Sequence, residues 1–264
     1  MNYKRLVTIF LTLVSLSAQA EQRWFEIELL LFQRNVDIKN INEHLSSQQI
    51  VVDSSNSITL LNAKKSVPCL AEGVCLSKAN PTVIGSAEFN SSGNGFQRLS
   101  SSRLRFSAQR QRLEKHAGFK PLLHMAWRMP VARGTSARPI HIFAGRNLAL
   151  SMENSLSDKW EIDGNFKIYL DHYLYIDSQL IIRKKITEQI KTVAQKIELS
   201  EDDNGVQIAQ PIDHVADNNA TVKASYQTVI KEILFDQNRR LRSEEIHYLD
   251  HPLMGIIVQI RKIR

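Results

Sequence analysis

The chain has 264 residues, with 34 Lys and Arg against 27 Asp and Glu, and its formal net charge is +7. Its only cysteines are Cys69 and Cys75, which are too few for a thiolate zinc site and are not spaced as a Cys-x-x-Cys redox motif. A modest positive charge suits anionic partners such as wall polymers, lipid headgroups or acidic proteins, but it also serves solubility alone.

Residues 1–20 have the pattern of a secretory signal peptide. Lys4 and Arg5 precede an apolar run from Leu6 to Leu16, and Ala18-Gln19-Ala20 is a small-x-small cleavage site. The alternative is an uncleaved anchor, but the apolar run is too short to span a bilayer. We therefore expect a soluble, exported protein that begins at Glu21 and carries a net charge of +5.

Residues 21–264 are expected to form a single α+β domain with irregular insertions near 35–95 and 188–224. Both insertions are rich in polar residues, and connections of this length are usually functional or partly disordered. In an oxidising compartment, Cys69 and Cys75 are expected to form a disulfide that closes a small surface loop.

Alternation of apolar and polar side chains predicts most of the elements. Residues 23–34 (RWFEIELLLFQR) alternate with period two and predict a central strand. Because the connections look like hairpins, we expect mainly antiparallel pairing. The other predicted strands are residues 119–129, 140–144, two runs within 160–186 joined by a turn at Asp177-Ser178, 226–235, and a last strand containing Ile256, Val258 and Ile260.

Residues 98–116 predict the one clear helix, since Leu99, Phe106 and Leu113 repeat every seven positions and Gly118 follows as a stop signal. Its remaining positions are strongly basic and include Arg105, Arg110 and Arg112. Such a run is usually a solvated helix face, and the functional alternative is an anion-binding face.

The sequence lacks the familiar motifs of hydrolases, nucleotide-binding proteins and metalloproteases, and we expect neither an enzyme nor a cofactor. The best metal candidate is His247, Asp250 and His251. In a strand the two histidines share a face but lie roughly 13 Å apart, too far to hold one ion. A wall hydrolase would need convergent carboxylates, and the acids to check are Glu26, Glu28, Asp171 and Asp250.

Two aromatic segments resemble each other: Tyr169-Leu170-Asp171-His172-Tyr173-Leu174 and Tyr248-Leu249-Asp250-His251-Pro252-Leu253. Two such strands could lie side by side, with cross-strand polar pairs that only fix the register. The functional alternative is a face of tyrosines, Tyr169, Tyr173, Tyr175 and Tyr248, on which a sugar ring stacks.

Arg239, Arg240 and Arg242 form a second basic cluster, which we expect in a short turn. Three neighbouring guanidinium groups repel each other unless acids or a ligand neutralise them. Glu244 and Glu245 could do so internally. Otherwise the arginine forks suit bidentate recognition of carboxylates, such as those of peptidoglycan stem peptides. Nucleic acid is not an expected partner, because no recognition fold is indicated.

Four stretches carry a resemblance to a known family: RWFEIELLLFQR, LLHMAWRMP, GNFKIYLDHYLYIDSQL and RRLRSEEIHYLDHPLMGIIVQI. In this order they resemble the CsiV family of periplasmic, peptidoglycan-binding cell-shape proteins. The resemblance implies a non-enzymatic role in cell-wall synthesis, supporting bifunctional penicillin-binding proteins through their outer-membrane lipoprotein activator. The alternative is an interaction scaffold that never touches the wall. The candidate binding residues come from charge and aromatic placement alone.

Overall fold

The computed structural model describes residues 23–38, 41, 50–62, 75–85, 88–89, 95–151, 157–192, 198–201, 207–210 and 223–263. The predicted signal peptide and Cys69 lie outside these residues, so the leader and the Cys69–Cys75 bridge stay predictions. Cys75 is described, and its thiol is not free.

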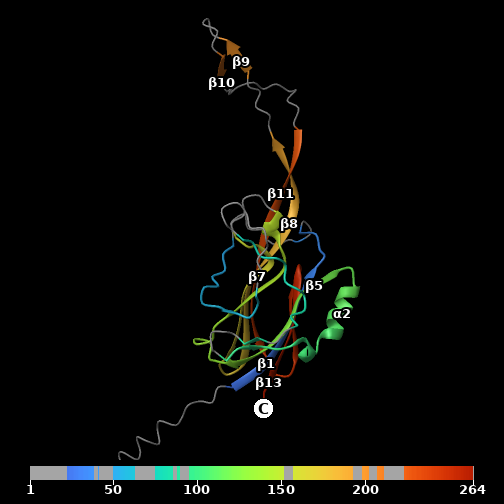
Figure 1. The fold of residues 1–264 in the computed structure, drawn as a ribbon, viewed down its shortest axis with the longest axis vertical. Helices are drawn as coiled ribbons and strands as arrows, with labels where there is room; N and C mark the ends of the chain where they lie inside the picture. The colour runs from blue at the N-terminus through green and yellow to red at the C-terminus, as the bar shows by residue number, and fades with distance from the viewer. Residues whose placement is uncertain are drawn as a thin grey trace, which may run out of the picture. The chain divides into compact units, whose positions relative to one another are not determined.

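The described strands form two main sheets of antiparallel long strands (Figure 1). The larger sheet has the order β12-β13-β1-β5-β4-β3, the second has the order β11-β8-β7-β6-β2, and β9 and β10 form a separate pair. The strands are β1 (Arg23–Arg34), β2 (Ile58–Thr59), β3 (Glu88–Phe89), β4 (Gln97–Arg98), β5 (Phe119–Val131), β6 (Ile140–Asn147), β7 (Trp160–Leu170), β8 (Leu174–Thr192), β9 (Glu198–Glu201), β10 (Gln207–Gln210), β11 (Lys223–Leu241), β12 (Ile246–His251) and β13 (Met254–Lys262).

The chain divides into two compact units. The first comprises residues 1–183 and 232–264 and holds the six-stranded sheet and most of the five-stranded sheet. The second comprises residues 184–231 and holds residues 184–192 of β8, residues 223–231 of β11 and the β9–β10 pair. An ion pair of 2.9 Å joins Lys231 to Glu188 within this second unit.

The central position predicted for residues 23–34 is confirmed. β1 pairs antiparallel with β13 on one side and with β5 on the other. Its odd-numbered face buries Ile27, Leu29 and Leu31 completely. Burial of each such side chain contributes about 1.5–3 kcal/mol. The even-numbered face is buried as well, although it carries Glu26 and Glu28.

The predicted helix over residues 98–116 is too long. Arg98 pairs with Trp127 in the larger sheet, and its buried guanidinium donates to Leu60 O at 2.6 Å. A 3-10 turn, η3 (Ser101–Arg103), follows, and the α-helix within the described residues is α2 (Ser107–Lys115). A second 3-10 turn, η4 (Leu148–Ser151), follows β6. Leu99 and Phe106 are buried, as a helix stripe would be, but they belong to a strand extension and a helix start.

The turn predicted at Asp177-Ser178 is also wrong. β7 ends at Leu170, which pairs with Leu174, so the turn is Asp171 to Tyr173. Asp177 and Ser178 lie inside β8. The polar residues Asp171 and His172 lie in this turn. On the next strand, burial alternates through Leu174, Ile176 and Ser178, so the strand continues past the predicted turn.

The two similar aromatic segments do not lie side by side, because β7 belongs to the five-stranded sheet and β12 to the six-stranded sheet. Each segment instead ends a strand and enters a tight hairpin. The second hairpin turns at Pro252 and Leu253, between the paired residues His251 and Met254. The repeated residues therefore reflect a shared hairpin form.

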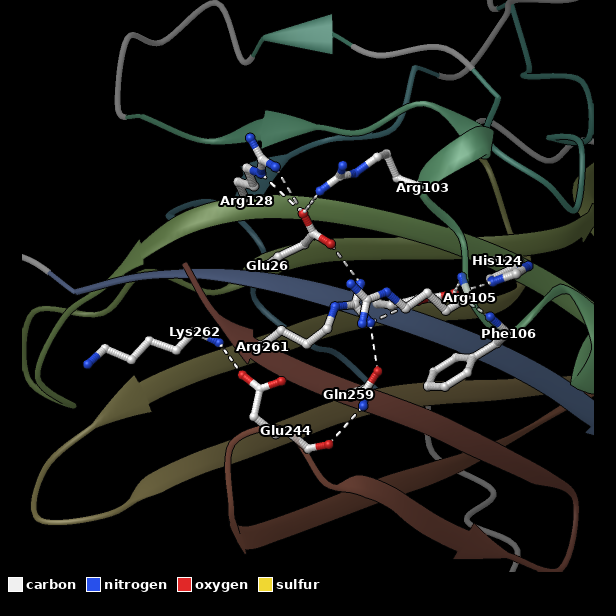
Figure 2. A network of polar contacts seen from close by, with 11 residues as sticks. Glu26, Arg103, Arg105, Phe106, His124, Arg128, Glu244, Gln259, Arg261 and Lys262 are labelled. Carbon is white, nitrogen blue, oxygen red and sulfur yellow. Dashed lines mark hydrogen bonds and ion pairs between the residues drawn. The ribbon is translucent and has the colours of Figure 1, made fainter. Parts of the chain in front are cut away.

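A buried ionic network covers the even-numbered face of β1 (Figure 2). Glu28 Oε1 accepts hydrogen bonds from the backbone N–H groups of Arg105 and Phe106 at 2.6 and 2.7 Å, and it lies 3.0 Å from His124 Nε2. Arg261 donates to Glu28 Oε2 at 3.1 Å and to Glu26 Oε1 at 2.9 Å. The network therefore fixes the start of α2 on strands β1, β5 and β13, where a carboxylate also favours the helix N-terminus.

Arg103 and Arg128 complete the surroundings of Glu26. Both donate to Glu26 Oε2, at 2.9 and 3.2 Å, and both side chains are partly exposed, unlike that of Arg261. Burial raises the pKa of the Glu26 carboxyl, but hydrogen bonds and charge from Arg103 and Arg261 outweigh it and lower the pKa to about 2. Burial also raises the pKa of Glu28, and the hydrogen bonds from His124, Phe106 and Arg261 reverse that shift and lower it.

Replacement Glu28→Gln should destabilise the fold by about 3 kcal/mol or more, because it leaves the buried Arg261 charge partly uncompensated. Urea unfolding would measure the loss. Glu114→Gln is the matched control, since Glu114 is exposed where it pairs with Arg110 on α2, and its replacement should cost less than about 1 kcal/mol. Equal, small losses in both variants would contradict the role given to the network.

The network also predicts acid sensitivity. The pKa of Glu26 is lower in the folded chain than the value of about 4.3 expected on unfolding. Its stabilisation is therefore complete above about pH 5 and is lost as the pH falls towards about 2. We expect the free energy of unfolding, measured in urea at a series of pH values, to fall over this range, with a shallower slope in Glu26→Gln. An unchanged slope in that variant would refute the assignment.

Candidate functional site

Tyrosines meet on the five-stranded sheet beside the β7–β8 turn. Tyr169 and Tyr175 are paired across the two strands, and their rings stack with centroids 5.1 Å apart. The Lys167 ammonium lies 5.4 Å from the centre of the Tyr169 ring. Asn238, on β11, donates to the Tyr169 hydroxyl at 3.1 Å. Strand pairing thus places side chains from three strands on one face.

Arg240 extends this group towards solvent. Its guanidinium carbon lies 4.4 Å from the centre of the Tyr173 ring, and that tyrosine is 53 % exposed at the turn. A guanidinium stacked on an aromatic ring keeps its N–H edge available for an anion. We call the set Lys167, Tyr169, Tyr173, Tyr175, Asn238 and Arg240 the Tyr–Arg face.

The arginines predicted in a turn lie at the end of a strand. Arg239 and Arg240 are the exposed last residues of β11 before Leu241, and Arg242 begins the connection to β12. Arg242 lies 3.6 Å from Glu245, and both side chains are exposed. Within the described residues, the Arg239 side chain has no hydrogen-bond or ion-pair partner.

The acids considered as internal partners are mostly engaged elsewhere. Glu244 has a positive φ of 72°, its carboxylate accepts from Lys262 N at 2.8 Å, and its carbonyl accepts from Gln259. Asp250 pairs with Arg34 at 2.5 Å. Of the three arginines, only Arg242 has an acidic partner, Glu245, among the described residues. Arg239 and Arg240 are therefore available to a ligand.

Tyr248 does not join the other tyrosines. It lies on β12, where its ring stacks on Phe32 and its hydroxyl lies 2.7 Å from Arg34 and 2.8 Å from Asp250. Gly255 permits this, because a Cβ there would lie 2.5 Å from Phe32 and 2.7 Å from the Tyr248 hydroxyl. Burial and the hydrogen bond to Asp250 raise the pKa of Tyr248. Its contacts are those of a structural tyrosine.

The three predicted arginines of the helix region have different surroundings. Arg105 is exposed and precedes α2, and its backbone rather than its side chain contacts Glu28. Arg110 pairs with Glu114, one turn along the helix. Arg112 is exposed and, in the part of the chain that is described, contacts no acid.

The four acids checked for hydrolysis do not converge. Glu26 and Glu28 are saturated with donors inside the fold. Asp171 Oδ1 accepts from Gly134 N at 3.2 Å, and Asp250 binds Arg34 and Tyr248. His247 is occupied by the Arg242 backbone. Over the described ranges, no group of three or more His, Cys, Asp or Glu side chains is placed to hold a metal ion.

Sequence reasoning missed two members of the Tyr–Arg face. Lys167 could have been found, because it lies two residues before Tyr169 and therefore on the same face of one strand. Asn238 could not, since nothing local indicates which residue of a strand so distant in sequence faces Tyr169. It also missed His141 and Asp163, which are 2.8 Å apart on neighbouring strands but share no recognisable motif.

A family model described as "Peptidoglycan-binding protein, CsiV" matches residues 4–263, nearly the whole chain. The chain belongs to the CsiV family. This confirms the resemblance carried by the four sequence stretches, and the CsiV description makes peptidoglycan the expected ligand and suggests a periplasmic location. No curated protein and no solved structure matches the chain. Among the described residues, no helix is long and apolar enough to cross a membrane.

Proposed function

We propose that this CsiV-family protein is a non-enzymatic periplasmic accessory protein that binds peptidoglycan through the Tyr–Arg face and Arg239. The observation that carries the proposal is the position of Arg240 on Tyr173, beside the stacked Tyr169–Tyr175 pair. Cations and aromatic rings meet there on the surface of a protein whose family is described as peptidoglycan-binding.

Each half of the face suits one part of the polymer. Stem-peptide carboxylates would bind the guanidinium forks of Arg239 and Arg240, because an arginine offers two parallel N–H donors to a carboxylate. Tyr173 offers an exposed ring edge and face to the apolar side of a neighbouring sugar or peptide. The stacking on Tyr173 orients Arg240 before binding, which lowers the entropy lost on association.

The arginines near the helix have a secondary role in this proposal. Arg105 and Arg112 are exposed and add positive potential that attracts an anionic polymer over a distance of about 10 Å at moderate salt. Arg110 contributes less, because Glu114 offsets its charge. Tyr248 is omitted, because its hydroxyl is held by Arg34 and Asp250.

We further propose that the bound protein supports wall synthesis and cell shape. It would promote the activity of a penicillin-binding protein through that enzyme's outer-membrane lipoprotein activator. The absence of convergent acids among the four candidates supports a non-enzymatic role, and turnover of labelled peptidoglycan by the purified protein would refute it. Stimulation of glycan polymerisation in a mixture of the three proteins would test the partner assignment.

An interaction scaffold that does not bind the wall is the second candidate. It is favoured by the position of β11 at the edge of the five-stranded sheet. An edge strand offers backbone N–H and C=O groups to which a partner can add a strand. Leu234, on the same strand, is 42 % exposed.

Pelleting with isolated sacculi separates the two functions. The double variant Arg239→Ala/Arg240→Ala should weaken binding about tenfold or more, since each charged hydrogen bond contributes about 1.5–3 kcal/mol. The control Arg23→Ala/Lys78→Ala removes the same charge from two exposed sites without described side-chain partners and should stay within about twofold of the wild type.

Failure of the wild-type protein to pellet would refute wall binding and favour the scaffold. Equal losses in the two double variants would show that net charge, rather than the Tyr–Arg face, drives the binding. Binding through the face should also weaken as salt is raised, because the arginines are exposed.

A further inference from the structure

Two adjoining cavities lie between the five-stranded sheet and the segment 50–62. Their volumes are about 430 and 290 Å³, and His141 and Asp163 line both of them. Thr59 lines the larger cavity and Ser54 the smaller one. Together they form a cleft, here called the His–Asp cleft, whose size is that of sites for small ligands.

Hydrogen bonds hold the polar floor of the cleft in place. His141 Nε2 lies 2.8 Å from Asp163 Oδ1, and Arg183 donates to Asp163 Oδ2 at 3.2 Å. Arg183 Nε also donates to Glu232 at 2.7 Å, and the second oxygen of Glu232 accepts from Ile50 N at 2.9 Å. One chain of contacts therefore fixes both the floor and the covering segment.

The covering segment is anchored at two further points. Asn165 donates to Asp53 O at 2.6 Å, and Ile58 N donates to Pro139 O at 2.8 Å. The cleft is therefore formed before a ligand arrives, which reduces the entropy lost on binding.

The wall of the larger cavity is aromatic on one side. Phe143 lies beside Trp160, with ring centroids 5.0 Å apart, and beside His141 at 5.1 Å. Both Phe143 and Trp160 line the cavity, but they are packed in the sheet and each is only 4 % exposed. Flat rings beside hydrogen-bonding groups form the combination that binds a sugar, whose ring has apolar C–H faces and polar edges.

Three residues of this cavity have polar groups to offer. Within the described residues, His141 Nδ1, the Trp160 indole N–H and the Thr59 hydroxyl have no hydrogen-bond partner. The charged side chains that line the cavity itself are Asp158 and Asp163, with no Lys or Arg among its lining residues. Arg183, which lines the smaller cavity, is already paired with Asp163 and Glu232, and the polar groups of the larger cavity offer acceptors and donors to sugar hydroxyls.

We propose that the His–Asp cleft binds one pyranose ring of an uncharged glycan. The ring contacts the small exposed parts of Phe143 and Trp160, and its hydroxyl or acetamido groups bond to Asp163, His141 and Thr59. The sugar ring would come from a peptidoglycan strand. Only this choice of glycan rests on the proposed function. The cleft would hold the sugar while the Tyr–Arg face holds carboxylates.

Calorimetric titration of the full mature protein with a tetramer of N-acetylglucosamine, which carries no peptide and no carboxylate, tests the proposal. Binding should be detected and should shift the fluorescence of Trp160. Trp160→Phe keeps an aromatic ring but loses the N–H, and Thr59→Val keeps the shape but loses the hydroxyl. Each should weaken binding about five- to tenfold. Equal thermal stability of the variants would show that folding is intact.

The variant Glu114→Gln, on α2 and outside the lining of both cavities, is the control and should bind the tetramer as the wild type does. Absence of binding by the wild type, or unchanged binding by both cleft variants, would overturn the proposal even if sacculi still pellet the protein. Binding of the tetramer without pelleting would refute the wall role and leave the cleft standing. Competition by a lysine-containing peptide that lacks sugar would show that the cleft selects an amine instead.

Discussion

The fold depends on two carboxylates buried on the central strand of its larger sheet. Burial of a charge costs several kcal/mol unless it is paired and hydrogen-bonded. Glu26 and Glu28 meet that requirement only because β13 brings Arg261, β5 brings His124 and Arg128, and the segment before α2 brings two backbone N–H groups. Because each element supplies a partner to the same two carboxylates, none of them can be displaced without leaving a buried charge unpaired.

This arrangement separates the charges that hold the fold from those available to a ligand. Arg261 has both carboxylates as partners and is buried, whereas Arg239 and Arg240 lie exposed at the end of β11. Asp163 also has fixed partners. Burial raises the pKa of its carboxyl, but the contacts with His141 and Arg183 outweigh burial and lower the pKa. Its carboxylate thus stays charged at neutral pH at the edge of an open cleft.

Local pattern was enough to predict the long strands of the two main sheets, but not the short strands β2, β3, β4, β9 and β10 or the neighbours of each strand. Period-two alternation located β1 and β5, because each strand buries a regular series of side chains against a layer. The pattern wrongly predicted one helix through Leu99 and Phe106. These residues are spaced seven apart, but one extends a strand and the other begins a helix, and each is buried by different neighbours. The pattern failed again at Asp177, which was polar enough for a turn but lies opposite Lys167 inside a hairpin.

A candidate site could be predicted when its residues lie close together in the sequence, and could not when they come from distant segments. The arginines at 239 and 240 and the tyrosines at 169 and 173 stand out in the sequence, and the structure brings Arg240 onto Tyr173. Tyr248 looked equivalent, but its sheet and its contacts with Arg34 and Phe32 separate it from them. The His–Asp cleft left no local signal, because it is made where segment 50–62 crosses strands from a distant part of the chain.

We propose that peptide carboxylates and sugar bind at two separate places on this protein. Titration of the isotope-labelled mature protein with a soluble disaccharide–tetrapeptide fragment of peptidoglycan, followed by amide chemical shifts, tests it most directly. We expect the largest shifts at Tyr173, Arg239 and Arg240 and around His141 and Asp163. Shifts confined to α2, or no shifts at saturating fragment, would contradict it.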